Sequence, residues 1–232
     1  MSLDFDRFDA ITFDCYGTLI DWEEGILNAL QPVLAPRGVE TAPDELLERY
    51  ARHEAGLEAG GYLPYREILA RALRGLCDEL GVAPSEAEGD AFAQAIADWP
   101  AFPDTAAALR RLHTRFRLGV ITNCDRDLFA LSNRRLGNTF DWVVTAEDAR
   151  AYKPGLRPFE LAFETIDVPR ERILHAAQSL FHDHVPAGQL GLASVWVDRR
   201  HDREGFGATP PASASPNLVV PDMATLARLA VG

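Results

Sequence analysis

The sequence is poor in positive charge. Its 23 lysines and arginines are outnumbered by 35 aspartates and glutamates, and the formal net charge is −12 at pH 7. A protein that binds a phosphate backbone or an anionic membrane surface usually carries the opposite balance. We therefore predict neither a nucleic acid nor a membrane as the partner of this chain.

Cysteine is scarce as well, and long apolar runs are missing. The three cysteines, Cys15, Cys77 and Cys124, lack the spacing of metal ligands, so we expect reduced thiols that hold no metal. No run approaches the roughly 18 apolar residues of a membrane-spanning helix. The first residues, MSLDFDRFD, are acidic where a secretory signal is basic, so we expect a cytoplasmic protein.

The hydrophobic pattern changes twice along the 232 residues. The segment FDAITFDC is a short apolar run that suits a buried strand ending near Asp14. Residues 20–99 repeat apolar residues at helical spacing with Pro or Gly between the repeats, which is typical of a block of about four helices. From residue 100 on, strand-like and helix-like segments alternate, which indicates βαβ units.

These patterns predict an α/β fold, a doubly wound parallel sheet with helices on both faces. Residues 1–19 and 100–232 would form this core, and residues 20–99 would be inserted into it as a helical cap. Residues 199–217, RRHDREGFGATPPASASPN, fit neither element. We predict a loop there, which is either a surface excursion or a flap over the active site.

Polar side chains follow the predicted strands at the point where each strand ends. Asp14 ends the first strand, Thr122 and Asn123 follow LGVI, Lys153 comes soon after VVTAED, and residues 178–183, QSLFHD, follow ILHAA. The carboxyl ends of parallel strands meet at one edge of the sheet, where ligands gather. Each of these residues alone is more often a turn or loop residue, but the ordered set predicts a single cleft.

The residue types in this set suit a reaction in which a carboxylate is the nucleophile. A carboxylate such as Asp14 can act as a nucleophile and form an ester, which splits a difficult displacement into two easier steps. Lys153 nearby would keep Asp14 ionised, and Asp183 would hold Lys153 in place. Thr122 could bind an anionic group of the substrate, and Thr18 could hydrogen-bond across the turn that follows Asp14.

The ordered set resembles the four motifs of the haloacid dehalogenase superfamily, which match residues 14–18 (DCYGT), Thr122, Lys153 and Asp183. The resemblance covers nearly the whole chain and implies a Rossmann-like core with a helical cap. Most members are phosphatases that place a second Asp two residues after the nucleophile, beside magnesium. Here Tyr16 takes that position, and a phenol with a pKa of about 10 cannot replace this acid near neutral pH.

The stretch DCYGT instead resembles the type II L-2-haloacid dehalogenase branch, which implies that no metal or other cofactor is needed. By this resemblance Asp14 attacks carbon 2 of an (S)-2-haloalkanoate and expels halide, and water then attacks the ester to release a 2-hydroxy acid. Thr122 and Asn123 would hold the carboxylate of this small substrate. Arg52 of the cap would receive the halide, with Arg49 as the alternative.

The resemblance also adds four residues to the expected substrate-binding set, which are Cys15, Tyr16, Gln178 and Ser179. The chain departs from this branch at three positions. Gln178 and Leu180 stand where the branch has Ser and Asn, and Phe159 stands where it has Tyr. These departures concern the substrate and leave the aspartyl-ester chemistry intact. The resemblance further implies that a homodimer is possible.

Three alternatives stay open. The segments DCYGTLIDWE, DWPAFPDT, SLFHDHVPA and RRHDREGFGAT are similar to hydrolases of the same branch that open the ring of L-azetidine-2-carboxylate. There the leaving group is a tethered amine, and His182, His184 and His201 become candidate donors, or else simply cap a helix or face solvent. The second alternative is a magnesium-dependent phosphatase, and the third is a binding protein without catalysis.

Overall fold

The structure is a computed structural model that describes residues 3–232. Six parallel strands form one sheet in the order β3-β2-β1-β4-β5-β6. The strands are β1 (Ala10–Phe13), β2 (Arg117–Thr122), β3 (Trp142–Thr145), β4 (Ile173–Ala177), β5 (Ala193–Val197) and β6 (Leu218–Val220). Because β1 lies inside the sheet and the chain winds outward from it in both directions, the order is the doubly wound, Rossmann-like one. The predicted fold class is confirmed.

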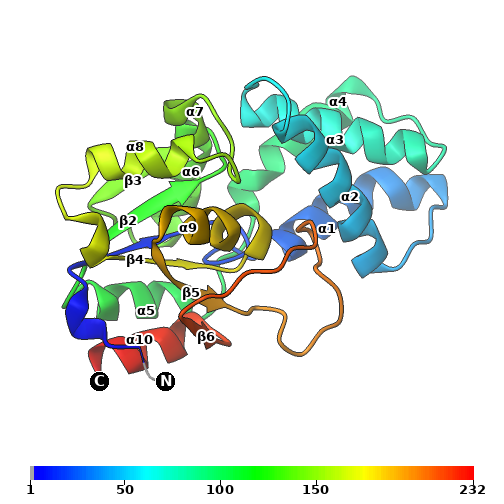
Figure 1. Ribbon diagram of the computed structural model, residues 1–232. Helices are drawn as coiled ribbons and strands as arrows, with labels where there is room; N and C mark the ends of the chain where they lie inside the picture. The colour runs from blue at the N-terminus through cyan, green and yellow to red at the C-terminus, as the bar shows by residue number, and fades with distance from the viewer. Residues whose placement is uncertain (1–2) are drawn as a thin grey trace.

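Helices cover both faces of the sheet (Figure 1). They are α5 (Thr105–Leu112), α6 (Arg126–Arg135), α7 (Ala146–Ala149), α8 (Arg157–Thr165), α9 (Val185–Leu190) and α10 (Met223–Val231). Phe13 and Val120 pack into the same cluster as α5 and α10, whereas Ala10 and Ile121 pack with α8 and α9. This alternation follows from the two-residue period of a strand.

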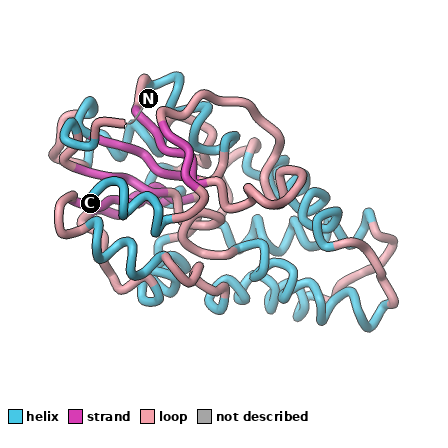
Figure 2. Tube along the Cα trace, turned by 90° about the horizontal axis from the view of Figure 1, so that it is seen from below, coloured by secondary structure: helices cyan, strands magenta, loops and turns pink. Residues whose placement is uncertain are grey.

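Residues 20–99 form a helical block beside the sheet. Its helices are α1 (Trp22–Leu34), α2 (Pro43–Glu58), α3 (Tyr65–Glu79) and α4 (Glu86–Gln94), with the short 3-10 turns η2 (Ala35–Arg37) and η3 (Ala95–Asp98). Two further short turns, η1 (Phe5–Arg7) and η4 (Arg170–Arg172), lie outside the block. The strands gather at one end of the molecule, and the helical block extends away from them (Figure 2).

Polar contacts join the helical block to the core, and two of the residues that make them follow strands of the sheet. Asp125, just before α6, accepts a hydrogen bond from the backbone N–H of Tyr65 at 2.9 Å and so satisfies the first amide of α3. Arg200, just after β5, donates to Glu23 of α1 and, at 2.8 Å, to Asp44 of α2. The side chain of Arg200 is only 7% exposed, so it is buried between the helical block and the core.

The long loop over residues 199–217 is present as predicted and connects β5 to β6. Arg199 donates to the carbonyl oxygen of Thr18 at 3.0 and 3.1 Å. Thr209 donates to the side-chain oxygen of Gln178 at 3.4 Å. The loop therefore lies against the two segments that follow β1 and β4.

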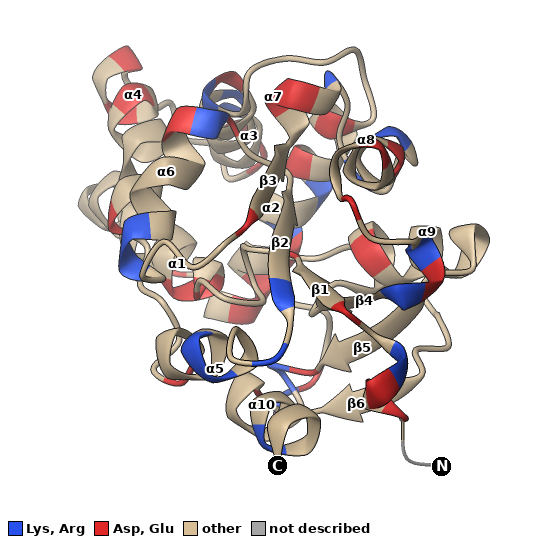
Figure 3. Cartoon of the chain, turned by 90° about the vertical axis from the view of Figure 1, so that its left-hand side faces the viewer, with Lys and Arg blue, Asp and Glu red and all other residues tan. Residues whose placement is uncertain are grey.

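Acidic and basic residues are interspersed over the side of the molecule in Figure 3, in keeping with an excess of acids spread along the chain. Among the helices of residues 3–232, none is long and apolar enough to cross a membrane.

Gly25 is the point of closest packing between α1 and Trp99. A Cβ atom at Gly25 would lie 2.3 Å from two ring atoms of Trp99, which is buried. We expect Gly25→Ala to lower the free energy of unfolding by about 1–3 kcal/mol in urea titrations, because the ring has to move. Gly56→Ala in α2 is the control, since nothing lies within 4 Å of its Cβ position. It should leave stability unchanged or raise it by up to about 1 kcal/mol; equal losses in both variants would contradict this packing.

Candidate active site

The site begins at the turn that follows β1. Asp14 comes directly after this strand, and Gly17 adopts a φ of +91° that favours glycine. A Cβ atom at Gly17 would also lie 2.9 Å from Trp22, so the turn needs glycine twice over. Thr18 Oγ1 donates to Asp14 Oδ2 at 2.7 Å and accepts from the backbone N–H of Gln178 at 2.9 Å. The predicted hydrogen bond of Thr18 thus joins the ends of β1 and β4.

Lys153 lies between two carboxylates. Its Nζ donates to Asp14 Oδ1 at 2.9 Å, to Asp183 Oδ1 at 2.7 Å and to the carbonyl oxygen of Ile121 at 2.9 Å. The side chain is 1% exposed, so all three donors of the ammonium are used in the interior. Burial lowers the pKa of Lys153, but the charges of Asp14 and Asp183 outweigh it and hold the pKa above its ordinary value.

The two carboxylates respond to this ammonium in opposite ways. Burial raises the pKa of Asp183, but Lys153 and then His175 outweigh it and hold the pKa below its ordinary value. For Asp14 burial is the larger effect and raises its pKa, although Lys153 acts to lower it. The pKa of Asp14 is therefore higher than that of Asp183. This difference suits Asp14 as the nucleophile and Asp183 as the carboxylate that holds Lys153 in place.

His175 is a member of this network that the sequence did not reveal. It lies within β4, and its Nε2 donates to Asp183 Oδ1 at 3.0 Å. Its Nδ1 lies 2.9 Å from Thr12 Oγ1, which fixes the orientation of the ring. The only signal was a histidine inside the otherwise apolar strand ILHAA. The second oxygen of the carboxylate, Asp183 Oδ2, is buried without a hydrogen-bond partner among the described residues.

These groups surround a small cavity between the sheet and the helical block. It is lined by Asp14, Tyr16, Trp22, Glu54, Glu58, Tyr65, Asn123, Lys153, Ser179, His182 and Asp183. Its volume is ≈ 30 Å³. Residues of the core and of the helical block thus meet around one small cavity.

Two of the predicted residues, Asn123 and Ser179, line this cavity, and Thr122 comes directly before Asn123 in the chain. Thr122 ends β2 with a buried Oγ1 that has no partner among residues 3–232. Asn123 receives a hydrogen bond from the backbone N–H of Lys153 at 2.8 Å and donates to its carbonyl oxygen at 3.0 Å. The amide of Asn123 thus holds the backbone of Lys153 in place. Ser179 Oγ accepts from the backbone N–H of His182 at 2.9 Å.

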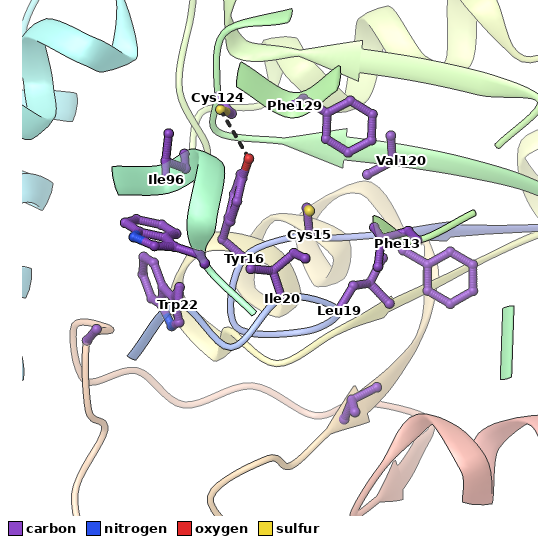
Figure 4. Packing of buried hydrophobic residues seen from close by; sticks show 14 of the residues in the cluster. Phe13, Cys15, Tyr16, Leu19, Ile20, Trp22, Ile96, Val120, Cys124 and Phe129 are labelled. Atoms are coloured by element: carbon purple, nitrogen blue, oxygen red, sulfur yellow. Dashed lines mark hydrogen bonds between the residues drawn. The ribbon is translucent and has the colours of Figure 1, made fainter. Parts of the chain in front are cut away.

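Tyr16 and Cys15 turn their polar atoms into the protein core (Figure 4). The hydroxyl of Tyr16 lies 3.1 Å from Ser132 Oγ, and Cys124 Sγ donates to it at 3.5 Å. Its ring still lines the cavity and meets Trp99 edge to face. Cys15 is fully buried in the hydrophobic cluster, and burial raises its thiol pKa. The thiol of Cys15 is therefore turned away from the cavity, and a contact of Cys15 with substrate stays a prediction.

Arg52 was placed wrongly. Its side chain is 61% exposed and donates to Glu79 at 3.1 Å, on the outer surface of the helical block. Arg49 pairs with Glu79 as well. The inner face of α2 is instead formed by Tyr50, Glu54 and Glu58, which follow one another at intervals of four residues. Arg52 is two residues from Tyr50 and from Glu54, and therefore points to the other side of the helix.

The side chain of Gln178 does not lie where the sequence predicted it. Its side-chain oxygen accepts from Thr209 at 3.4 Å, and its carbonyl oxygen accepts from Trp196 at 2.8 Å. It lines two neighbouring depressions on the side of the long loop, whereas the cavity around Asp14 is lined by other residues. Gln178 contributes to the site through its backbone N–H, which binds Thr18.

The three histidines have different surroundings. His182 belongs to the π-helical turn η5 (Leu180–His184) and lines the cavity with a buried Nε2 that has no hydrogen-bond partner in the described chain. Its Nδ1 lies 3.0 Å from Ser179 Oγ, and burial lowers its pKa to about 4. His184 is held by Ser194 and by a backbone carbonyl behind the site, and His201 is exposed on the long loop. Only His182 contacts the cavity.

Two glutamates of α2 complete the lining and were missed by the sequence analysis. Glu54 Oε1 accepts from Tyr50 at 2.9 Å and from Tyr65 at 2.8 Å. Glu58 accepts from Asn123 Nδ2 at 3.2 and 3.3 Å. Burial raises the pKa of Glu54 to about 7 and that of Glu58 well above its ordinary value. Acids on a cap helix usually face solvent, so only their spacing from Tyr50 indicated the inner face.

The chain is similar to known proteins over most of its length. The family model of haloacid dehalogenase-like hydrolases matches residues 8–176. The (S)-2-haloacid dehalogenase H-109 of Pseudomonas putida is 29% identical over 208 residues, which are 87% of this chain and 91% of that protein. The haloacetate dehalogenase H-2 of Moraxella sp. (strain B) is 27% identical over 229 residues, which are 96% of this chain and 98% of that protein.

Solved structures share the fold. The L-2-haloacid dehalogenase from Xanthobacter autotrophicus superposes with a TM-score of 0.80 at 21% identity, over 97% of this chain and 99% of that chain. Another structure of that enzyme, with chloropropionic acid covalently bound, superposes with the same TM-score. At this level of identity the likeness concerns the fold, and function has to be argued from the site.

The raised pKa of Glu54 makes stability depend on pH. Between about pH 4.5 and pH 7 the folded state binds more protons than the unfolded state, so the free energy of unfolding falls as pH rises. In Glu54→Gln, which keeps an acceptor for Tyr50 and Tyr65, we expect this fall to shrink by up to roughly 3 kcal/mol. Urea titrations at about pH 5 and about pH 7.5 measure the difference. The exposed Glu171→Gln should behave as the unsubstituted protein, and an unchanged fall in Glu54→Gln would refute the assignment.

Proposed function

Because the chain belongs to the haloacid dehalogenase-like hydrolase family, we propose that it hydrolyses a small carboxylate by attack of Asp14 on a saturated carbon, as in the (S)-2-haloacid dehalogenase reaction. The observation that carries the proposal is the fixed carboxylate of Asp14 at the cavity, with Lys153 on one oxygen and Thr18 on the other. The similarity to (S)-2-haloacid dehalogenases over nearly the whole chain supports it.

In the first step, an oxygen of Asp14 attacks carbon 2 of the substrate. A C–O bond forms, the carbon–halogen bond breaks, and the halide leaves with the bonding electron pair. The product is an ester of Asp14 with inverted configuration at carbon 2. The covalent chloropropionic acid in the Xanthobacter enzyme is the kind of intermediate that such chemistry predicts for this chain.

In the second step, water attacks the carbonyl carbon of the ester and releases the 2-hydroxy acid. Because Lys153 and Thr18 donate to different oxygens of Asp14, the oxygen that carries no ester keeps a donor. That donor stabilises the negative charge of the tetrahedral intermediate. Asp183 Oδ2 lines the cavity without a partner among the described residues, and we assign it to accept a hydrogen bond that orients the attacking water. One proton of this water passes to the departing oxygen of the hydroxy acid and the other leaves to solvent, so that Asp14 returns as a carboxylate.

Two donors are available for the carboxylate of the substrate. Thr122 Oγ1 is unpaired in the described chain at the end of β2. His182 Nε2 is unpaired as well and reaches the cavity. Because Ser179 Oγ already accepts from the backbone N–H of His182, its own proton can bind Nδ1, which leaves the ring proton on Nε2. Both groups can therefore donate to an anion.

The site does not suit the magnesium ion of the related phosphatases. The ammonium of Lys153 occupies the position between the carboxylates of Asp14 and Asp183, 2.9 and 2.7 Å from them. The second acid of a magnesium site is replaced by Tyr16, whose hydroxyl is bound to Ser132. A magnesium ion requires several oxygen ligands. Three of the four carboxylate oxygens of Asp14 and Asp183 are bound to Lys153 or Thr18, and only Asp183 Oδ2 has no partner among the described residues.

The cap forms part of the proposal. We assign residues 1–19, of which the first two lie outside the described residues, and residues 100–232 to the core, and residues 20–99 to the cap. The core supplies Asp14, Lys153 and Asp183, and α2 lines the other side of the cavity. Ring opening of L-azetidine-2-carboxylate uses the same nucleophile with another leaving group and stays a prediction. A homodimer and a cytoplasmic location also stay predictions.

Isotope labelling tests the nucleophile. During repeated turnovers of (S)-2-chloropropionate in oxygen-18 water, we expect the label to enter the carboxylate of Asp14, because water attacks the ester carbonyl. Mass spectrometry of the peptide with Asp14 measures it. Asp14→Asn should lower kcat roughly 10³-fold or more, and EDTA should change nothing. If the label appeared in the product alone, the ester intermediate would be excluded. If EDTA abolished the activity, the metal-free route would be excluded.

Thr122 provides a test of substrate binding. Thr122→Val keeps the shape of the side chain and removes its donor, so KM for the substrate should rise about 10- to 100-fold while kcat changes less. The exposed Thr114→Val is the control and should leave both constants unchanged. An unaltered KM in Thr122→Val would show that the carboxylate binds elsewhere.

A further inference from the structure

The cap wall of the cavity lies where the leaving group of the proposed reaction departs. Attack by an oxygen of Asp14 inverts carbon 2, so the leaving group moves off on the side of this carbon that faces away from Asp14. Asp14 follows β1, and the helical block lines the cavity with Trp22, Glu54, Glu58 and Tyr65. None of the described residues that line the cavity is an arginine. The leaving group therefore has to find its hydrogen-bond donor among other side chains of this wall.

Two of the four side chains on the cap wall are directed elsewhere. The hydroxyl of Tyr65 donates to Glu54 Oε1 at 2.8 Å. The indole Nε1 of Trp22 lies near the turn that follows β1, 2.9 Å from the position of a Cβ atom at Gly17, and thus on the side of the nucleophile. The carboxyl groups of Glu54 and Glu58 remain, and a carboxyl group donates a hydrogen bond only while it carries a proton.

We propose that Glu58 donates a hydrogen bond from its carboxyl group to the departing halide, and that this halide is fluoride. The inference rests on the proposed function, because it names the leaving group of the reaction in which Asp14 attacks. The C–O bond to Asp14 forms, the carbon–fluorine bond breaks, and fluoride leaves with the bonding electron pair. Glu58 keeps its proton and holds the ion. Fluoride is the smallest halide and concentrates its charge most, so it gains most from a donor at this place.

The contacts of Glu58 favour the protonated carboxyl group. Its side chain is 5% exposed, and no lysine or arginine pairs with it in the part of the chain that the structure describes. The neutral amide of Asn123 donates to its two oxygens at 3.2 and 3.3 Å, and His182 Nε2 lies 3.6 Å away, beyond a normal hydrogen bond. A buried carboxylate without a cationic partner takes up a proton, because its desolvation is not offset.

The charges around Glu58 act on its pKa in both directions. Burial raises this pKa well above its ordinary value, the charges of Glu54 and Asp14 raise it further, and Lys153 lowers it. The effect of Lys153 is outweighed, since its ammonium is bound to Asp14 and Asp183. The other titratable groups that face Glu58 are neutral near pH 7. They are His182, whose pKa burial lowers to about 4, and Tyr50, Tyr65 and Tyr152, whose pKa values burial raises.

Asn123 positions this carboxyl group relative to the reacting end of the core. Its Nδ2 donates to Glu58 and also, at 3.0 Å, to the carbonyl oxygen of Lys153. Its side-chain oxygen accepts from the backbone N–H of Lys153 at 2.8 Å. One amide thus connects the acid of the cap with the residue that holds the nucleophile.

Glu54 is the less suitable donor of the two. The hydroxyls of Tyr50 and Tyr65 donate to its Oε1, and both hydrogen bonds stabilise the ionised form. Burial raises the pKa of Glu54 to about 7, so this group loses its proton near neutral pH. Glu58 receives no hydroxyl donor among the described residues and keeps its proton to higher pH.

Two substrates that differ only in the halogen test the assignment. We expect the unsubstituted protein to release fluoride from (S)-2-fluoropropionate and chloride from (S)-2-chloropropionate, both measured with ion-selective electrodes. Glu58→Met removes the donor, so the ratio of kcat for the fluoro substrate to kcat for the chloro substrate should fall roughly 10- to 100-fold. Glu48→Met, exposed on the same helix, is the control and should keep the ratio of the unsubstituted protein.

The pH profile distinguishes hydrogen-bond donation from a purely structural role. In the unsubstituted protein the fluoro-to-chloro ratio of kcat should fall as pH rises through the pKa of Glu58, because the donor is lost and a carboxylate repels the departing fluoride. Asp14 and Glu54 titrate with either substrate, so their contributions cancel in the ratio. Glu58→Gln offers an N–H donor that does not titrate. Its ratio should be lower near pH 7 and should not change over the same range.

Several outcomes would overturn the inference. They are an unchanged fluoro-to-chloro ratio in Glu58→Met, and a ratio in Glu58→Gln that still falls with pH. Chloride release with oxygen-18 label in Asp14, but without any release of fluoride, would also overturn it and leave the proposed reaction standing. If neither substrate led to label in Asp14, the proposed reaction itself would be refuted, and this inference with it.

Discussion

The ammonium of Lys153, held between Asp14 and Asp183, is the interaction on which the rest of the site depends. It connects the ends of three adjacent strands, because its third hydrogen bond goes to the carbonyl oxygen of Ile121 in β2. Asn123 binds the backbone of Lys153 at both its N–H and its carbonyl, so the segment that carries the lysine is fixed as well. One buried cation therefore holds together the carboxyl ends of β1, β2 and β4.

Such an arrangement is costly to form and hard to alter. Burying charged groups takes them out of water, and their mutual attraction offsets this cost only if every donor finds an acceptor. Lys153 meets that condition with three acceptors, and Asp183 gains a further donor from His175. All three donors of the ammonium are thus paired in the structure without a substrate, and Asp14 has a raised pKa at the cavity. Preorganisation of this kind spares the reaction the cost of reorienting its own charges.

The core half of the site could be predicted because topology determines it. In a parallel sheet the residues after each strand converge, so the positions of Asp14, Lys153 and Asp183 in the sequence were enough to place them together. The direction in which a side chain turns after the strand was not determined in this way. Cys15 and Gln178 sit in the right segments, yet their side chains pack into the core and against the long loop.

The cap half could not be predicted, because the rotation of a helix about its axis depends on what it packs against. Arg52 and Glu54 are two residues apart on α2, and the resemblance to the dehalogenases favoured the arginine as the inner residue. The structure places Tyr50 in the interior. Glu54 and Glu58 follow it at intervals of four residues, lie on the same face of the helix and therefore reach the cavity. The strand ends thus fix how the nucleophile is held, whereas the packing of α2 fixes which side chains of the cap face it across the cavity.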